Sequence, residues 1–481
     1  MLQPADAVID SRLAADNPWW RAGADALSVR HLPHRFAFAP FYDRLVGDDR
    51  RPLCLTGPHG AGKTVLLRQA IARLIADGYD PATLLWLPLD APLVAADDGM
   101  ACLHRFAAAQ NATRAVPRYA FLDGLDRLPD GLSSLDRLAS TWPDIRLVAA
   151  AAGPDRAPQA APGRVDSILP ALTFAEFIAF SRHLGPIGSK TGAERRSALD
   201  TALRAWLNIG SLAQSGIPGT PAGAPPWQLA GALLDRALDA ATLARHGIQE
   251  PDALLRFLLH VVARTGAETA YETLARDTGL AKNTLRKFLA CLEAAGLVRR
   301  LDRRDGRGRR YERATRFILH VAQPALYTAL FGPVRQPGAA LTALAQAGYF
   351  SQGPQGATAC YAGWADRTVD AVYVSEDSTP ITAACLAGSD EICENPAESL
   401  APLIEFARNI GLASVDAHTR TRMDFLTIDG VAIRFLPLAV GCYSVPLDVL
   451  EAGDSGLVDP RALRAPDGPE EDETSEDAAA A

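Results

Sequence analysis

The chain lacks the segments that carry proteins into or across membranes. Its first residues, MLQPADAVIDSR, have no apolar core of the kind that a signal peptide needs. No window holds about 18 uncharged apolar residues, so we expect no membrane-spanning helix. The seven cysteines are scattered and include no C-x-x-C pair, which argues against a disulfide framework or a zinc site. We therefore expect reduced thiols and a cytoplasmic location.

An overall excess of basic residues is also lacking, because the formal net charge is -8. The 481 residues are too many for one hydrophobic core, so we expect two to four domains. Part of the acidity lies in Asp467–Asp477, DGPEEDETSED, which has no aromatic or branched aliphatic residue and predicts a disordered tail. Without this tail the body is closer to neutral, which leaves room for a local basic patch.

The first half predicts an α/β unit from about Leu32 to Phe180. Five short apolar runs are bounded by Gly, Pro or Asp, as in a parallel sheet covered on both faces. They are Pro52–Thr56, Thr83–Leu89, Arg118–Leu122, Ile145–Ala149 and Ser167–Leu169. Between the first two, apolar residues repeat at helical spacing until Gly78.

A phosphate-binding motif separates the first strand from this helix. The residues are Gly57, Pro58, His59, Gly60, Ala61, Gly62, Lys63 and Thr64, which match G-x-x-x-x-G-K-S/T. In such a loop the backbone N–H groups surround phosphates, the lysine reaches the β and γ phosphates, and the Thr hydroxyl ligates magnesium. The sequence therefore predicts binding of ATP with Mg²⁺.

The strand at 118–122 ends in a carboxylate suited to this magnesium ion. Asp123 follows the strand and is expected to hold the ion through water. Many P-loop ATPases place Glu directly after this Asp to orient the attacking water, but Gly124 stands here. Asp126 is the alternative water-positioning group, although an Asp at this place more often caps the following turn.

The second half predicts a helical region and then a strand-rich one. Residues 209–227 are rich in Gly, Pro and Ala and predict a hinge. Residues 251–320 have the pattern of a winged helix, with helices over 253–264, 271–277 and 282–295 and then a strand pair. Beyond Gly348 we expect strands at Thr368–Val374, Ile381–Ala387, Ala413–Ala417, Asp424–Ile428 and Val431–Leu436, with one helix at Ala397–Asn409.

Two basic segments of the winged-helix region are candidates for contact with duplex DNA. Lys282, Asn283, Arg286 and Lys287 project from the exposed side of the last helix, where a recognition helix contacts bases. The hairpin Arg299–Arg310 holds seven arginines against two aspartates. The alternative is a solvated turn whose arginines pair with acidic residues of a neighbouring domain or subunit.

Motifs along most of the chain resemble those of bacterial and archaeal AAA-type ATPases with a C-terminal domain of unknown function. They are Asn17-Pro18-Trp19-Trp20, LTGPHGAGKTVLLRQAI, Gly163–Ile178, His246–Leu255 and Leu280–Leu301. The resemblance implies a P-loop AAA-type parallel-sheet domain, a helical and winged-helix region, a degenerate restriction-endonuclease-like α+β domain, and a homo-oligomer. We expect an N-terminal segment at 1–31, the P-loop domain at 32–180 and a helical and linker region at 181–250. The winged helix is then expected at 251–320, the nuclease-like domain at 321–450 and the acidic tail at 451–481.

The chain departs from this family at residues of the hydrolysis machinery. The family usually has Asp-Glu where Asp123-Gly124 stand, and hydroxyl residues where the fourth strand ends in Ala149–Ala152. Arg164 matches a family Gly-Arg pair and is either an arginine finger or an ordinary surface arginine. Asp370 resembles a nuclease metal ligand, but the next strand has neither the Glu nor the Lys that a nuclease needs, so we expect no nuclease activity.

Three functions follow as expectations. The first is an ATP-binding switch or assembly factor with weak hydrolysis. The second is a winged-helix DNA-binding regulator in which ATP is a structural ligand. The third is an ATP-driven motor, which the missing hydrolysis residues disfavour.

Overall fold

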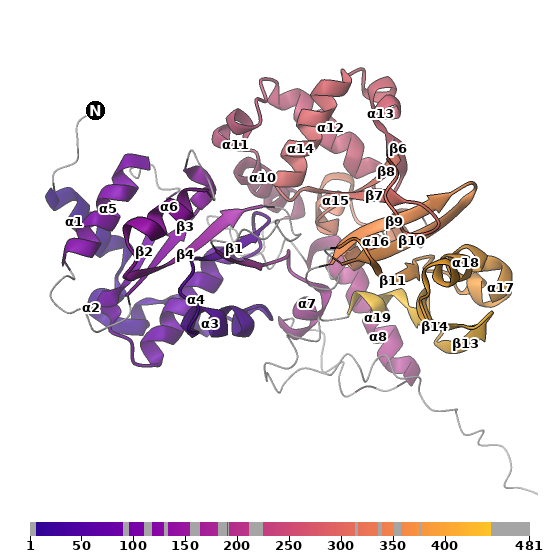
Figure 1. Cartoon of the computed structure of the whole chain (residues 1–481), viewed down its shortest axis with the longest axis horizontal. Coiled ribbons are helices and arrows are strands. Elements are labelled where there is room, and N and C mark those ends of the chain that lie inside the picture. Colours follow the sequence, from indigo (N-terminus) through magenta and orange to yellow (C-terminus); the bar gives the residue numbers. More distant parts are fainter. Residues whose placement is uncertain are drawn as a thin grey trace, which may run out of the picture.

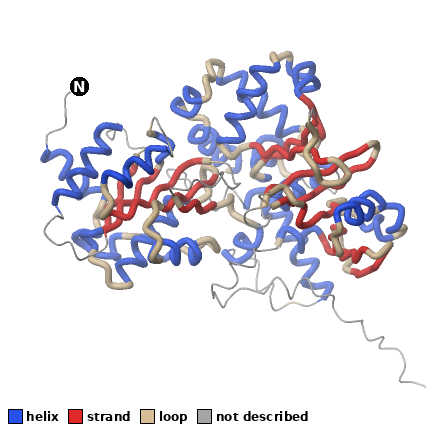
Figure 2. The backbone as a smooth tube through the Cα atoms, in the orientation of Figure 1, coloured by secondary structure: helices blue, strands red, loops and turns tan. Residues whose placement is uncertain are grey.

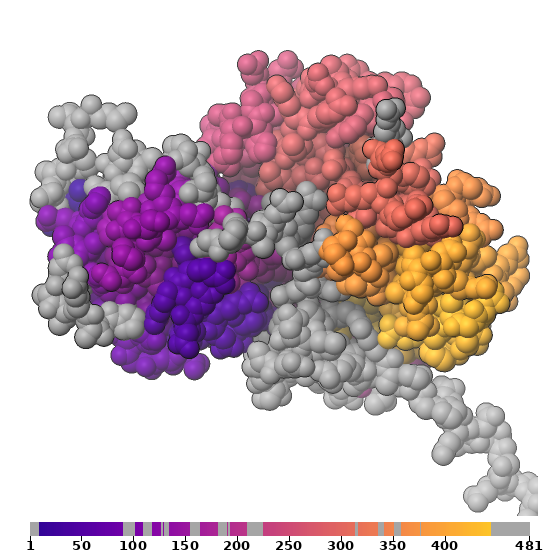
Figure 3. Space-filling view, viewed as in Figure 1, coloured from indigo at the N-terminus to yellow at the C-terminus, as the bar shows by residue number. Residues whose placement is uncertain are grey.

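The computed structural model has two lobes that stand side by side (Figures 1 and 3). It describes residues 6–89, 96–109, 118–128, 133–153, 164–180, 190, 192–210, 225–312, 316–334, 339–350, 357–375 and 377–443. The expected acidic tail 451–481 and most of the expected hinge lie outside these residues. We call the described residues up to 169 the N-terminal lobe and the rest the C-terminal lobe.

The N-terminal lobe is built on a five-stranded parallel sheet of order β2-β3-β4-β1-β5. The strands are β1 (Leu53–Gly57), β2 (Leu84–Pro88), β3 (Arg118–Asp123), β4 (Ile145–Ala152) and β5 (Val165–Ile168). All five lie where the apolar runs predict them, with ends that differ by at most three residues. The α/β prediction for this part of the chain is confirmed.

Helices cover both faces of this sheet because its strand residues alternate between two cores. One face packs on α3 (Phe38–Val46) and α4 (Lys63–Ala76). The other packs on α1 (Asp6–Asp16), α5 (Ala96–Ala109) and α6 (Ser133–Thr141). In Figure 1 these two helical layers lie below and above the strands. All the strand ends that carry site residues are therefore held in a fully covered sheet.

The Asn17-Pro18-Trp19-Trp20 motif closes the open edge of β2. The Asn17 side chain accepts a hydrogen bond from Trp86 N at 2.5 Å and donates to Trp86 O at 3.1 Å. The indole N–H groups of Trp19 and Trp20 both donate to Leu84 O. Side chains from α2 (Trp19–Ala22) and the residues before it thus act as a substitute for a neighbouring strand, which protects the edge.

The C-terminal lobe begins with helices and a three-helix unit. The first helices are α7 (Phe174–Phe180), α8 (Gly192–Ala205), α10 (Pro226–Ala237) and α11 (Ala240–Arg245), with a π-helical turn at Trp206–Gly210. The three-helix unit has α12 (Pro251–Ala263), β6 (Glu268–Ala270), α13 (Tyr271–Thr278), α14 (Lys282–Ala294), β7 (Val298–Arg304) and β8 (Arg316–Val321). Its helices match the three that the winged-helix pattern predicts.

A nine-stranded sheet joins this unit to the rest of the chain, in the order β13-β14-β12-β11-β10-β9-β7-β8-β6 (Figure 2). The further strands are β9 (Thr358–Trp364), β10 (Arg367–Val374), β11 (Pro380–Cys385), β12 (Ser414–Thr419), β13 (Asp424–Ile428) and β14 (Val431–Pro437). The expected boundary near residue 320 therefore does not separate two sheets. The reason is the parallel pairing of β7 with β9, which joins Asp302 to Cys360.

Several helices of this lobe and the strand β9 escaped sequence reasoning. They are α15 (Pro324–Phe331), α16 (Ala339–Phe350) and α19 (Leu438–Cys442). The expected helix at 397–409 is divided into α17 (Pro396–Ser399) and α18 (Ala401–Ile410). Helices α15, α16 and α19 are apolar around most of their surface, so their sequences show little helical periodicity. One core contains residues from all three and from α8, α10, α12 and α14. The C-terminal lobe thus has one large helical core, and a second core lies between α18 and the strands β9–β12 and β14.

We predict that Asn17→Ala lowers the free energy of unfolding by about 1–3 kcal/mol, since it leaves the buried Trp86 N–H without its acceptor. Chemical denaturation monitored by tryptophan fluorescence measures this. Asp25→Ala, which removes an exposed carboxylate, is the control and should change stability by less than about 0.5 kcal/mol. Equal stability of wild type and Asn17→Ala would contradict the role given to this edge.

Candidate nucleotide-binding site

The P-loop connects the carboxyl end of β1 to the first turn of α4, as its motif predicts. Gly57 is required by a close approach, because a Cβ there would lie 2.0 Å from Leu169 O. Gly60 and Gly62 have φ of 77° and 93°, in the left-handed region that favours glycine. The three glycines thus place the loop backbone at the positive end of α4, a place suited to phosphate.

Lys63 lies over its own loop. Its Nζ donates to Gly57 O at 2.7 Å and to Pro58 O at 2.8 Å. Burial lowers the pKa of Lys63 to about 8, and the charges of Asp126 and Asp123 oppose part of this decrease. The ammonium is therefore a buried cation with only carbonyl acceptors, which makes it a good partner for phosphate oxygens.

Thr64 and Asp123 meet as predicted. Thr64 Oγ1 donates to Asp123 Oδ2 at 2.7 Å, although the two residues are 59 positions apart. A hydroxyl and a carboxylate side by side supply the hard oxygen donors that Mg²⁺ prefers. These residues fit a Mg²⁺-nucleotide: Thr64 would ligate the ion directly and Asp123 through water.

Arg35 is a site residue that sequence reasoning missed. Its guanidinium donates to Ala61 O of the P-loop and forms a two-pronged ion pair with Glu176 of α7, at 2.7 and 2.8 Å. The side chains are only 10% and 2% exposed. Burial alone would raise the pKa of Glu176, but Arg35 and the N–H groups of Thr173 and Phe36 hold it below its ordinary value. The pair fixes the loop against the start of the C-terminal lobe.

The structure gives Gly124 a conformational reason for being glycine. Its φ of 84° and ψ of 40° lie in the left-handed region, and its N–H donates to Ala150 O. The neighbouring strand β4 ends in Ala149–Ala152, so it presents no hydroxyl beside the P-loop. The Glu expected after Asp123 and the hydroxyl expected at the end of the fourth strand are therefore both missing from these positions.

Asp126 is held in a structural role. Its Oδ1 accepts a hydrogen bond from Ala152 N at 2.8 Å, and its backbone carbonyl accepts one from Arg245 of α11. The carboxylate thus binds the end of β4 and not the following turn that the capping interpretation named. Its charge still reaches Lys63, where it acts to raise the pKa.

Two arginines from the C-terminal lobe reach this site and were also missed. Arg245 donates to Asp126 O, and the charge of Arg236 on α10 acts to lower the Lys63 pKa. Both lie after the Gly/Pro-rich segment, more than 160 positions beyond the P-loop. No local sequence pattern marks them as site residues. They add positive charge on the side of the loop that faces the C-terminal lobe.

Arg164 lies at the wrong edge of the sheet for the role of a catalytic arginine. It precedes β5, whose first residue pairs with Leu53, whereas the P-loop leaves the other end of β1. Its Nε donates to Asp166 at 2.8 Å, and its side chain is 10% exposed. In this arrangement the guanidinium is paired with Asp166 and lies away from the chain's own P-loop.

The expected arginine-rich wing is only partly free, because β7 is an interior strand while Arg307, Arg309 and Arg310 of the following turn are exposed. Strand β7 lies between β8 and β9, so both its edges are paired. Arg304 is 2% exposed, Arg303 donates to Gly363 O, and Arg309 pairs with Asp305. The turn after β7 packs on the C-terminal strands, where a Cβ on Gly308 would lie 2.4 Å from Pro380.

The exposed basic side of α14 is present as predicted. Lys282, Asn283, Arg286 and Lys287 are all exposed, while Leu285, Phe288, Leu289 and Leu292 form the buried stripe. Lys282 pairs with Glu272 at 2.6 Å, and both side chains are about half exposed, at 47% and 62%. Such exposed pairs contribute little to stability and compete weakly with another anion.

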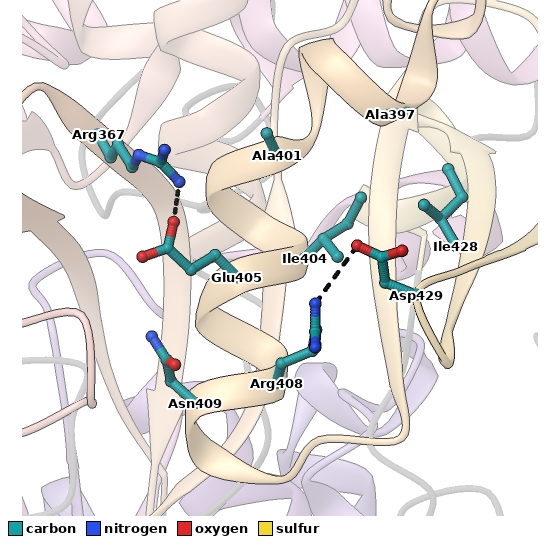
Figure 4. A pocket seen from close by; sticks show the side chains of 9 residues that line it. All are labelled: Arg367, Ala397, Ala401, Ile404, Glu405, Arg408, Asn409, Ile428 and Asp429. Atoms are coloured by element: carbon teal, nitrogen blue, oxygen red, sulfur yellow. Dashed lines mark hydrogen bonds and ion pairs between the residues drawn. The ribbon is translucent and has the colours of Figure 1, made fainter.

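The C-terminal strands supply no metal centre among the residues that the structure describes. Asp370 is buried on β10, accepts a hydrogen bond from Leu386 N at 2.6 Å, and has a pKa raised by burial. A cavity of about 530 Å³ lies between α18, the start of β10 and the β13–β14 turn (Figure 4). Its charges are already matched, Arg367 with Glu405 and Arg408 with Asp429.

Over the same described part of the chain, no helix combines the length and apolar character needed to cross a membrane. All seven cysteines are free thiols.

Comparison with known proteins identifies only part of the chain. A family model described as "Domain of unknown function (DUF8612)" matches residues 230–336. No curated protein matches the chain.

Three similar solved structures are each 13% identical to this chain. The Aeropyrum pernix Orc1 protein in complex with DNA has a TM-score of 0.30, with 65% of this chain and 95% of that one covered. PCH-2 of C. elegans has a TM-score of 0.20, with 60% and 71% covered. Hsp104 of S. cerevisiae in complex with casein has a TM-score of 0.24, with 54% and 49% covered. Scores this low carry no conclusion about function.

We predict that MgATP affinity decreases as the pH rises through about 8. ATP binds the charged form of Lys63, whose pKa is lowered to about 8, and phosphate raises that pKa again. Binding above this pH should therefore take up a proton, which calorimetry in buffers of different ionisation enthalpy measures. Lys63→Ala should bind much more weakly and show no such uptake. An affinity that stays constant through this pH range would contradict the prediction.

Proposed function

We propose that this protein binds MgATP at the P-loop and acts as a nucleotide-controlled switch or assembly factor. The observation that carries the proposal is the meeting of Lys63, Thr64 and Asp123 at the carboxyl edge of one parallel sheet. The ammonium offsets phosphate charge, and the two oxygen donors hold magnesium. Assembly into a homo-oligomer in the cytoplasm is part of this proposal.

The location of the site supports a switch. The P-loop lies at the junction of the two lobes, with Arg35 contacting it from one side and the α11 residue Arg245 contacting Asp126 from the other. A bound nucleotide adds negative charge between these groups. Its binding energy is therefore available to change how the lobes sit against each other, provided that the two arrangements bind it with different affinity.

Slow hydrolysis is the second element of the proposal. A positioned general base typically contributes about 10²- to 10⁴-fold to a rate. Gly124 provides none, and Asp126 is bonded to Ala152 N. The P-loop residues still supply charge stabilisation of the phosphates, so binding does not depend on the missing base.

We predict an ATP turnover well below the roughly 1–10³ s⁻¹ typical of enzymes. Gly124→Glu should not raise this turnover. Glu in the left-handed conformation of residue 124 costs about 1–2 kcal/mol, and nothing in the fold orients its side chain towards an attacking water. Gly124→Asn, which tolerates this conformation better, is the stability control. Phosphate release assays and denaturation measure both effects. Fast wild-type turnover that Asp126→Asn abolishes would show Asp126 to be the base and refute this reading.

A second candidate function, binding of duplex DNA, is favoured by the charge of α14. Its first two turns carry three cations and no acidic residue, at the helix end where cations are unfavourable. A phosphate backbone would offset that local cost. In this reading the three-helix unit is a winged helix that contacts DNA through Lys282, Arg286 and Lys287, while Arg299–Arg310 contributes only its exposed members.

The lysine distribution allows a direct test of both functions. The chain has only four lysines, Lys63, Lys190, Lys282 and Lys287. We predict that MgATP protects Lys63 from acetylation and that a duplex protects Lys282 and Lys287, as measured by mass spectrometry. Lys190, exposed and paired with Glu194, is the internal control and should react equally throughout. Unchanged reactivity of Lys282 and Lys287 with duplex present would remove the DNA candidate alone.

A further inference from the structure

Helix α14 touches the P-loop with its carboxyl end. The turn that follows it contains Gly296, which has a φ of 68° and packs against Pro58. A Cβ on Gly296 would lie 2.4 Å from Pro58 Cβ and 3.6 Å from Gly153 O, at the end of β4. There is thus no free space between α14, the P-loop and the strand beside it.

A second contact joins the same unit to the next P-loop residue. Gln323, which is 3% exposed and directly precedes α15, donates through Nε2 to His59 O at 3.4 Å. Ala322 N donates to Leu297 O, so Gln323 and the turn after α14 belong to one hydrogen-bonded element. Two consecutive P-loop residues are therefore in contact with one rigid part of the C-terminal lobe.

The other end of α14 carries the exposed cations. Lys282 begins the helix, and Arg286 and Lys287 follow within two turns. The 13 residues span about 20 Å, and the buried stripe from Leu285 to Leu292 fixes the helix in the large core of the lobe. A displacement at one end of such a helix is transmitted to the other end as a rigid-body movement.

A bound nucleotide and the carbonyl of Pro58 would compete for the ammonium group of Lys63. Lys63 Nζ donates to the carbonyls of Gly57 and Pro58, and phosphate oxygens of a bound nucleotide require the same ammonium. When the ammonium turns to phosphate, the Pro58 carbonyl loses its donor and the loop readjusts. Because Gly296 leaves no gap, that readjustment presses on the end of α14.

We infer that α14 links the two proposed ligands, so that nucleotide at the P-loop changes the affinity of its amino-terminal end for duplex DNA. This inference rests on the proposed function, both its nucleotide site and its DNA candidate. By linkage, duplex DNA then changes the affinity for MgATP by the same factor.

The test compares two glycine substitutions of equal backbone cost. Gly296→Ala places a methyl group against Pro58, whereas Gly279→Ala, at the end of α13 with φ of 72°, places it in open space. Both carry the cost of alanine at a positive φ, and Gly296→Ala should lower thermal stability further because its methyl group meets Pro58. The affinity of a short fluorescent duplex is measured by anisotropy at fixed salt, with and without saturating MgATP.

In wild type and Gly279→Ala we expect MgATP to change the duplex dissociation constant at least about fivefold, the lower range of allosteric coupling. In Gly296→Ala the factor should fall below about twofold. Calorimetric titration of MgATP with and without duplex should give the same factors. Both ligands binding to wild type without mutual effect, or equal loss of coupling in the two variants, overturns the inference alone. Failure of MgATP or duplex to bind overturns the proposed function and the inference with it.

Discussion

The buried ion pair between Arg35 and Glu176 is the constraint on which the site depends. One guanidinium satisfies the carbonyl of Ala61 in the P-loop and the carboxylate of α7, and also donates to Pro170 O and Ala171 O. Removing one partner of such a pair leaves an uncompensated buried charge, which costs about 3–5 kcal/mol. The pair therefore holds the phosphate loop beside the first helix of the C-terminal lobe, and the contacts of Arg245, Gln323 and Gly296 add to it at the same junction.

The C-terminal lobe acts on the site as one body. One sheet runs through the lobe from β6 to β13. One hydrophobic core holds the three-helix unit and most of the helices, and a second core lies between α18 and strands β9–β12 and β14. Such a body moves as a unit, because separating its parts would expose strand edges and apolar surface. In the proposed switch, a small movement at the P-loop would be passed to the lobe through this continuous sheet.

The arginines divide into two groups with different physical roles. Those of β7 are held by strand pairing and by acceptors within the chain, and burial lowers the pKa of Arg299 to about 10. Helix α14 has one arginine, Arg286, which is exposed together with Lys282 and Lys287. A run of basic residues in the sequence therefore gives no measure of available charge, since hydrogen-bonded and buried guanidinium groups cannot neutralise phosphates.

The phosphate loop and the strands around it were predictable from the sequence, because they depend on contiguous residues whose backbone geometry is locally determined. The partnership of Thr64 with Asp123, 59 positions apart, was predictable from the motif and the strand end that carry them. The order of parallel strands then brings Thr64 and Asp123 to one sheet edge. Other features depend on partners far along the chain: Arg35 finds Glu176 141 positions away, and Arg245 finds Asp126 119 positions away. The pairing of β7 with β9 is another, and it makes the first part of the expected wing an interior strand while Arg307, Arg309 and Arg310 stay exposed. Local pattern determines which strand forms, but only the folded chain decides which strand edge and which charge it meets.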